Sequence, residues 1–216
     1  MRRVASAGPQ GGASMMAAAR LVVALLAAAA MGSPAAARSV ETIVLVRHGE
    51  KPSGGFGRLD CQGLNRAQAL PGVILGAFGK PDALFAPDPG HLKKDDGVKY
   101  PYRRPLQTLE PLSRQLGLPI QTPYGYKQTG RLAQALDAPD YRGATVVVAW
   151  EHKRLVDLAR RLMTEHGGDA DAVPRWHGSD FDGIYVVRIA RDGETARASF
   201  EQRRQGLDGQ SRNCPP

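Results

Sequence analysis

The chain has 216 residues, of which 23% are charged, and it carries a formal net charge of +8. The positive charges are spread along the chain without a block of like charges, which excludes the clustered basic stripe typical of nucleic-acid binding. We interpret them as a solvated surface that helps to attract anionic substrates.

The first 37 residues have the pattern of a secretory signal peptide. Arg20 precedes an apolar run over 21–30, and the small residues of 35–37 follow. Positive charge, apolar run and small residues in that order are typical of export, and the run is too short for a comfortable membrane span. We therefore expect cleavage after Ala37, a periplasmic or secreted protein, and no stable membrane span afterwards. An uncleaved membrane anchor is the alternative.

Residues 38–216 then form a single domain with a polar C-terminal tail. Without the three arginines of residues 1–37, the net charge falls from +8 to +5, which is mildly basic. Short apolar runs predict strands and longer periodic segments predict helices. The predicted strands are 42–46, 83–86, 119–121, 144–150, 185–189 and 195–200, and the predicted helices are 65–78, 105–116, 128–136 and 153–165.

The order of these elements predicts an α/β fold, because strands alternate with helices until two final strands close the chain. We expect a largely parallel sheet between helical layers. Two loops carry further information. Residues 53–57 are rich in glycine, and the long polar loop 87–101 is typical of an active-site rim or lid.

Two histidines follow predicted strands at matching positions. His48 follows Arg47 at the end of the first strand, and His152 follows the valine-rich strand. Open α/β sheets bind ligands at the carboxyl ends of their strands, so we expect both imidazoles at one edge. Arginine offers a planar cation for phosphate, and histidine a nucleophile near neutral pH. Arg104, at the start of a predicted helix, can join backbone N–H groups in holding an anion.

Four segments, in order, resemble the histidine phosphatase superfamily, which is also called the phosphoglycerate mutase-like superfamily. They are Val46–Glu50, Leu59–Leu70, Arg104–Leu109 and His152 after its strand. They match the opening strand with its signature, the leucine, glycine and Gln-Ala pattern, the second-arginine segment and the second histidine. The resemblance covers residues 42–189 and implies a three-layer, phosphoglycerate mutase-like sandwich.

The resemblance also implies a hydrolase that cleaves phosphomonoesters through a phosphohistidine. Arg47 and Arg104 would hold the non-bridging oxygens in bidentate fashion. His48 would attack phosphorus, and His152 would donate a hydrogen bond to the phosphoryl group. We expect Gly49 to contact the substrate as well. Because these side chains supply positive charge, the mechanism needs no metal and no cofactor, and the partner is a small phosphorylated molecule.

The leaving alkoxide needs a proton, and here the sequence departs from the family pattern. Many small members have a glutamate after the second-arginine helix, whereas residues 119–135 contain no acidic residue. Glu151, beside His152, is the first candidate for the proton donor. Asp180 and Asp182 are the next candidates, and a turn or capping role is the alternative for each of them.

Cys61 and Cys214 are the two cysteines of the chain. In an exported protein an even number of cysteines predicts a disulfide, which here would join the C-terminal tail to the segment after the first strand. Two unpaired thiols are the alternative. Their spacing does not match a metal site.

Two other functions are compatible with these residues. A phosphate-ester binding protein of the same fold, with little turnover, is favoured by the absent glutamate, but such a protein has no need of a nucleophile such as His48. A phosphomutase needs a second phosphate site and usually works in the cytosol, so the export signal argues against it.

Overall fold

The sheet is centred on a strand whose residues face its two sides in alternation. In the computed structural model, which describes residues 38–95 and 97–216, β1 (Ser39–Arg47) is flanked by β6 (Thr145–Trp150) and β7 (Gly183–Asp192). All the described residues belong to one compact unit. The predicted signal peptide, residues 1–37, lies outside them.

Six strands form the main sheet in the order β5-β2-β6-β1-β7-β8. The remaining members are β2 (Ala83–Phe85), β5 (Ile120–Gln121) and β8 (Thr195–Arg204). The pairs β1–β6, β6–β2 and β2–β5 are parallel, whereas β7 is antiparallel to both β1 and β8. The predicted largely parallel α/β sheet is confirmed.

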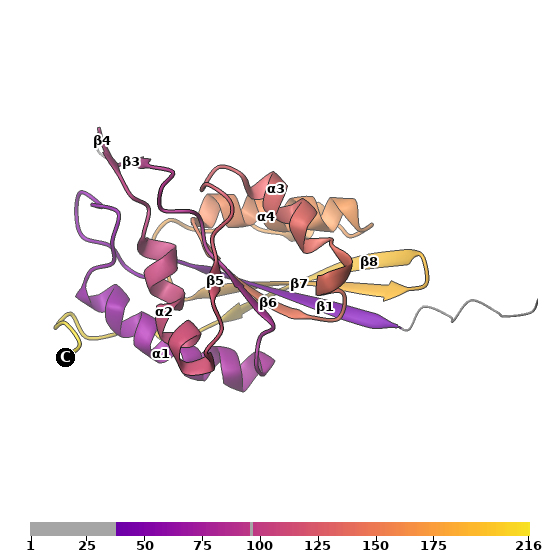
Figure 1. Cartoon of the computed structure of the whole chain (residues 1–216), viewed down its shortest axis with the longest axis horizontal. Helices are drawn as coiled ribbons and strands as arrows, with labels where there is room; N and C mark the ends of the chain where they lie inside the picture. The colour runs from indigo at the N-terminus through magenta and orange to yellow at the C-terminus, as the bar shows by residue number, and fades with distance from the viewer. Residues whose placement is uncertain (1–37, 96) are drawn as a thin grey trace, which may run out of the picture. The chain divides into compact units, whose positions relative to one another are not determined.

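Helices cover both faces of this sheet (Figure 1). One face packs against α1 (Cys61–Phe78) and α2 (Arg104–Leu116), and the other against α3 (Thr129–Leu136) and α4 (His152–Glu165). Single turns follow α3 and α4, at Pro139–Tyr141 and Ala170–Ala172. Across residues 38–95 and 97–216, no helix is both long and apolar enough to span a membrane.

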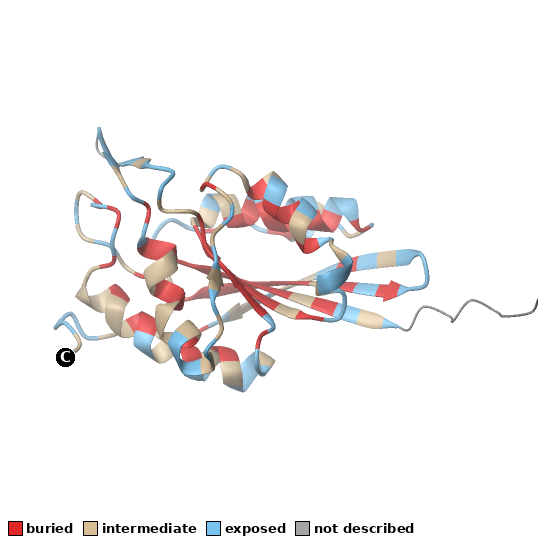
Figure 2. Ribbon diagram, in the orientation of Figure 1, coloured by how far each residue is buried: buried red, intermediate tan, exposed pale blue. Residues whose placement is uncertain are grey.

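The two cores follow from the alternation of side chains along the central strands. Ile43 and Leu45 pack under α3 and α4, whereas Val44 and Val46 pack under α1 and α2. Successive strand residues point to opposite faces, so a continuous apolar run is what a strand buried on both faces requires. Figure 2 shows the central strands buried along most of their length.

Several predicted elements have other boundaries in the structure. The first helix begins at Cys61 rather than residue 65, because the Asp60 carboxylate accepts a hydrogen bond from the Gly63 amide and caps it. The loop 87–101 contains a hairpin, β3 (Lys93–Asp95) and β4 (Val98–Tyr100). The last two strands are longer than predicted, since β7 pairs along its length with neighbours on both sides.

Candidate active site

The carboxyl ends of β1 and β6 lie side by side. Arg47 pairs with Trp150 in the parallel register, and the His48 amide donates a 3.1 Å hydrogen bond to the Trp150 carbonyl oxygen. Glu151 and His152 follow immediately, at the start of α4. The sheet therefore brings the two predicted histidines to one edge, as the sequence indicates.

His48 is held as a neutral imidazole with one free nitrogen. Its side chain is buried, and Nδ1 lies 2.8 Å from the Gly49 carbonyl oxygen. A carbonyl oxygen only accepts, so Nδ1 carries the hydrogen and Nε2 keeps its lone pair. Burial lowers the pKa of His48 well below 6.5, and the positive charges of Arg104 and Arg47 lower it further. The imidazole is therefore uncharged at neutral pH.

Arg47 is oriented by the loop that precedes β7. Its Nη1 donates to the carbonyl oxygens of Gly178 and Asp180, at 2.8 and 2.9 Å, and its guanidinium carbon lies 3.7 Å from the centre of the Phe181 ring. Burial lowers its pKa to about 10, so it remains positive at neutral pH. Within the described residues, its buried Nε has no hydrogen-bond partner. A buried donor without a partner is costly, and an anion would satisfy it.

Arg104 reaches the site from the first turn of α2. It is fully buried, its Nη1 donates a 2.9 Å hydrogen bond to the Gly55 carbonyl oxygen, and its guanidinium carbon lies 4.9 Å from the centre of the Tyr102 ring. The Tyr102 and His48 rings form a T-shaped pair, with 5.9 Å between ring centroids. The glycine-rich loop and Tyr102 thus hold Arg104 close enough to lower the pKa of His48.

The loop docks on α2 through its backbone. The Gly57 carbonyl oxygen accepts hydrogen bonds from the amides of Arg103 and Arg104, at 2.8 and 2.9 Å. Gly57 has a φ of +71°, and a Cβ there would stand 2.2 Å from the Pro101 carbonyl oxygen. Only glycine fits this close approach without a shift of the backbone.

Glu151 and His152 form the N-terminus of α4. The Glu151 carboxylate accepts a 3.2 Å hydrogen bond from the Arg154 amide, and its other oxygen lies 3.0 Å from Nδ1 of His152. Burial and the charge of Arg47 lower the pKa of His152. The Glu151 charge in turn raises the pKa of Arg47. Glu151 and His152 therefore both lie close enough to Arg47 to interact with its charge.

The two aspartates that were alternative proton donors are engaged elsewhere. Asp180 accepts hydrogen bonds from the amides of Asp182 and Gly183, both at 2.9 Å, which is a turn role. Asp182 is buried, and its two carboxylate oxygens contact the side chains of Arg66 and Arg204 and two backbone amides. These contacts favour structural roles for both aspartates.

Three residues of the site carry no signal in the sequence. Tyr102 and Phe181 form its aromatic walls. Lys93, from the β3–β4 hairpin, has its Nζ 4.8 Å from the centre of the Tyr102 ring, and its charge lowers the pKa of both His48 and His152. The length and polarity of the loop 87–101 predict an active-site rim, but no pattern distinguishes Lys93 from its neighbour Lys94.

Arg66, a buried arginine on α1, supports the loop after β1 that carries His48, Gly49 and Glu50. Arg66 contacts both carboxylate oxygens of Glu50 at 2.8–3.0 Å, and its Nη1 lies 3.2 Å from Asp182. Gly63 lies directly against the same loop, because a Cβ there would stand 2.3 Å from the Glu50 carbonyl oxygen. The start of α1 therefore packs tightly against the loop that follows β1.

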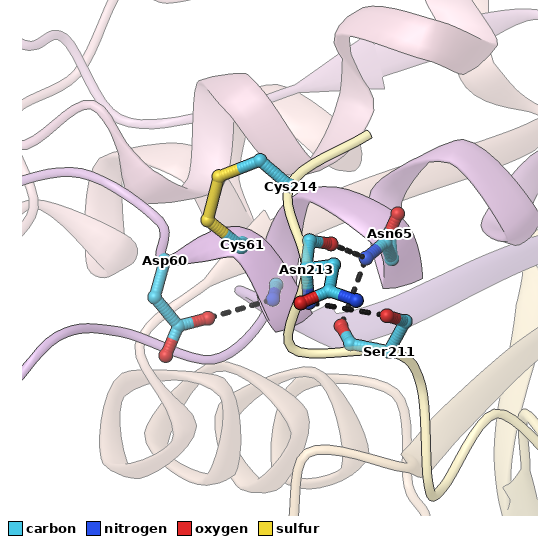
Figure 3. Close-up of a disulfide and its surroundings, with 7 residues drawn as sticks. Asp60, Cys61, Asn65, Ser211, Asn213 and Cys214 are labelled. Carbon is cyan, nitrogen blue, oxygen red and sulfur yellow. Dashed lines mark hydrogen bonds between the residues drawn. A yellow bond between two sulfur atoms is a disulfide. The ribbon is translucent and has the colours of Figure 1, made fainter. Parts of the chain in front are cut away.

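The predicted disulfide between Cys61 and Cys214 is confirmed (Figure 3). It ties the C-terminal tail to the first residue of α1, and Nδ2 of Asn65 donates to the carbonyl oxygens of Ser211 and Asn213, at 2.8 and 2.7 Å. The tail is thus fastened to the helix that supports the signature loop.

The described residues hold no cluster of three or more histidine, cysteine, aspartate or glutamate side chains that would suit a metal ion. What the site offers instead is positive charge. Arg104, Arg47 and Lys93 all lie close enough to His48 to lower its pKa, so three positive charges gather at this sheet edge. Such a set is suited to an anion with several oxygens, such as a phosphoryl group.

Comparison with solved structures finds several matches at low sequence identity. A mycobacterial hydrolase 1 is 13% identical over 75% of this chain and 97% of its own, with a TM-score of 0.51. A mycobacterial glucosyl-3-phosphoglycerate phosphatase is 14% identical over 74% and 97% of the two chains, with a TM-score of 0.46. A phosphoglycerate mutase from Plasmodium falciparum is 13% identical over 78% and 92%, also with a TM-score of 0.46.

No family model matches the sequence, and no curated protein matches it either. The chain shares the α/β fold of mycobacterial hydrolase 1. The three-layer α/β fold that the four sequence motifs imply is confirmed (Figure 1).

Proposed function

We propose that the chain is an exported phosphoric monoester hydrolase that works through a phosphohistidine on His48. The observation that carries this proposal is the state of that side chain. Its Nδ1 hydrogen is taken up by the Gly49 carbonyl oxygen, so the free lone pair is on Nε2. A pKa well below 6.5 keeps the ring uncharged beside two arginines. A neutral imidazole among cations is what an attack on a phosphate ester requires.

The arginines bind the substrate in this mechanism. A phosphomonoester brings close to two negative charges, and Arg47 and Arg104 offset them through bidentate hydrogen bonds to the non-bridging oxygens. The buried Nε of Arg47 supplies one donor for such a bond. Gly49, next to His48 in the chain, contacts the substrate in the same proposal. The phosphoryl group is then held in line with the attacking nitrogen.

The reaction proceeds in two displacements. In the first, Nε2 of His48 forms a bond to phosphorus while the bond from phosphorus to the ester oxygen breaks. His152 donates a hydrogen bond to the phosphoryl oxygens, where charge is redistributed in the transition state. In the second, water attacks the phosphohistidine, which releases phosphate and restores the neutral imidazole.

Glu151 is the proton donor to the departing alkoxide in this proposal. Its carboxylate lies 3.0 Å from Nδ1 of His152, and its charge raises the pKa of Arg47. In the protonated form it gives its proton to the leaving oxygen, and as a carboxylate it accepts one from the attacking water. No metal and no cofactor take part.

Substitution of His48 tests the mechanism directly. We expect p-nitrophenyl phosphate to be hydrolysed in the presence of EDTA, and His48→Ala to remove that activity. Activity that survives His48→Ala would exclude the phosphohistidine, and activity lost in EDTA but restored by a metal would exclude a metal-free reaction. If wild type binds phosphate tightly yet releases no product from any ester, the chain is a binding protein instead.

Leaving-group dependence tests Glu151. Glu151→Gln should slow an alkyl phosphate about 100-fold, and p-nitrophenyl phosphate much less, because nitrophenolate leaves without a proton. Equal slowing of both substrates would remove Glu151 from this role and leave it as the partner that orients His152.

Export is proposed on the pattern of residues 1–37 and on the disulfide, since disulfides persist in oxidising compartments. Fractionation of cells that express the full-length chain, with N-terminal sequencing of the product, tests it. A mature chain that begins at residue 38 outside the cytoplasm is the expected result. A full-length chain in the membrane fraction would support an uncleaved anchor.

A further inference from the structure

A cavity of about 660 Å³ opens beside His152. Six residues line it: His152, Lys153, Arg175, Trp176, His177 and Gly178. Four of them carry a positive charge or become positive when protonated, and none is acidic. The volume lies within the range of small-molecule sites. A lining of this kind is suited to a small anionic group.

The wall of the cavity is built on an anchored loop. Trp176 is buried, stacks on Tyr185 with 4.2 Å between ring centroids, and donates from Nε1 to the Asp180 carbonyl oxygen at 3.1 Å. Its two neighbours, Arg175 and His177, are exposed and line the cavity. The buried tryptophan therefore holds two basic side chains at the surface of a fixed loop.

The cavity also adjoins the phosphoryl site. His152 belongs to both, and the Gly178 carbonyl oxygen accepts the 2.8 Å hydrogen bond from Arg47. A Cβ on Gly178 would stand 3.8 Å from Nε2 of His152, which is an ordinary van der Waals contact, so Gly178 lies directly beside that imidazole. A leaving group attached to a phosphoryl unit at His48 can extend into this cavity.

A smaller cavity of about 290 Å³, lined by His91, Tyr126 and Lys127 among others, flanks the β3–β4 hairpin. It has fewer basic side chains than the larger cavity, and it includes none of Arg47, His48, Arg104 and His152. The larger cavity is therefore the better receptor for a charged leaving group.

We propose that the cavity beside His152 binds a second phosphoryl group, carried on the leaving group of the substrate. This inference rests on the proposed hydrolase function and specifies its substrate class as small bisphosphorylated molecules. Arg175 binds the second phosphate through its planar fork, and Lys153 adds a point charge from the first turn of α4. His177 contributes a ring N–H at the rim.

Matched substrates test the proposal. The release of phosphate is measured with glucose 6-phosphate and with glucose 1,6-bisphosphate, and the quantity compared is the ratio of their kcat/KM values. We expect wild type to favour the bisphosphate about tenfold or more, beyond the factor of two that two ester groups provide. The preference should shrink in 0.5 M NaCl, because salt screens exposed charges.

The double variant Lys153→Gln/Arg175→Gln should bring the ratio close to two. The control is Lys80→Gln/Arg114→Gln, which removes the same charge from exposed positions near the C-terminal ends of α1 and α2. The control should keep the wild-type ratio. A ratio near two in wild type, or one that falls equally in both double variants, would overturn the second phosphate site.

The outcome separates this inference from the proposed function. If wild type hydrolyses p-nitrophenyl phosphate and both sugar phosphates, with a ratio near two between the sugar phosphates, the hydrolase stands and the second phosphate site fails. If it hydrolyses none of the three, the proposed function itself fails, and the substrate class falls with it.

Discussion

The Gly49 amide donates a 3.1 Å hydrogen bond to the Thr108 hydroxyl, which donates in turn to the Arg104 carbonyl oxygen at 2.9 Å. These two hydrogen bonds join the loop that carries His48 to α2, the helix that carries Arg104. The Gly49 carbonyl oxygen also accepts the Nδ1 hydrogen of His48. The orientation of the imidazole therefore depends on a threonine in the middle of α2.

Thr108→Val should impair activity even though valine and threonine have nearly the same size. Valine keeps the shape of threonine but leaves the buried Gly49 amide without an acceptor, which costs about 1–3 kcal/mol of unfolding free energy. Displacement of the loop should lower kcat/KM for p-nitrophenyl phosphate about tenfold, since small errors in position cost catalysis heavily. Steady-state kinetics and chemical denaturation measure the two effects.

Thr108→Ser provides the control, because serine keeps the hydroxyl and loses only the methyl group. It should retain most of the activity. If the serine and valine variants lose activity equally, the hydrogen bond to Gly49 has no part in positioning His48.

The protonation of His48 gives a second prediction, which needs no substrate. Burial and the nearby arginines lower its pKa below 6.5, so its ring should stay neutral as the pH falls through 6.5. Substitution Arg104→Gln removes one of those charges and should raise the pKa of His48. Titration of the ¹⁵N-labelled imidazole by NMR measures both values. A wild-type pKa at or above 6.5 would contradict the environment described for the nucleophile.

The sequence was most informative where one short segment indicates both a strand and the residues at its end. A β-branched run that ends in Arg47 and His48 predicts both a buried strand and the candidate site residues at its end, and the valine-rich strand before His152 does the same. Parallel pairing then brings the two ends together without further information. Four motifs in order therefore predicted the fold and the position of His48 and His152 at one edge of the sheet.

The supporting residues could not be predicted in this way. Arg66 reads as a surface arginine on a helix, yet it is buried against Glu50 and Asp182, which lie 16 and 116 residues away along the chain. Its role depends on three segments that meet only in the folded protein. The same holds for Tyr102 and Lys93, whose loop carries no periodic pattern.

Removal of the disulfide should destabilise the fold strongly. Cys61 and Cys214 are separated by 153 residues, and in the chain-entropy description a loop of that length contributes about 4–5 kcal/mol by restricting the unfolded chain. Urea denaturation with and without dithiothreitol measures the difference. The Cys61→Ser/Cys214→Ser variant should show the lower stability under both conditions.

An unchanged midpoint in dithiothreitol, with the thiols shown by labelling to be free, would contradict this stabilisation. A more local effect is also expected. Once reduced, the tail loses its covalent tie to α1, and amide hydrogen exchange near Asn65 and Asn213 should become faster.

A buried glutamate at the amino end of β1 gives the last prediction. Glu41 is fully buried, and one of its carboxylate oxygens accepts a 2.9 Å hydrogen bond from Arg191. Arg191 also contacts Asp137 at 2.7 Å, so its charge is shared between two carboxylates. Burial raises the pKa of Glu41 from 4.5 to about 7, against the opposing effect of Arg191.

The direction of the pH effect follows from this raised pKa. Between about pH 4.5 and pH 7 the folded protein keeps a proton on Glu41 that the unfolded chain has released. The stabilisation is complete below pH 4.5 and is lost as the pH rises towards 7. Its size is at most about 3 kcal/mol, from the free energy of one pKa unit.

Glu41→Gln tests this, because the amide keeps the shape of the protonated acid and does not titrate. The unfolding free energy of wild type, measured in urea at pH 5 and pH 7.5, should fall relative to that of the variant as the pH rises. Glu194→Gln, at an exposed position in the turn between β7 and β8, should follow wild type. Equal pH dependence in wild type and Glu41→Gln would mean that Glu41 is ionised throughout this range and that Arg191 outweighs the effect of burial.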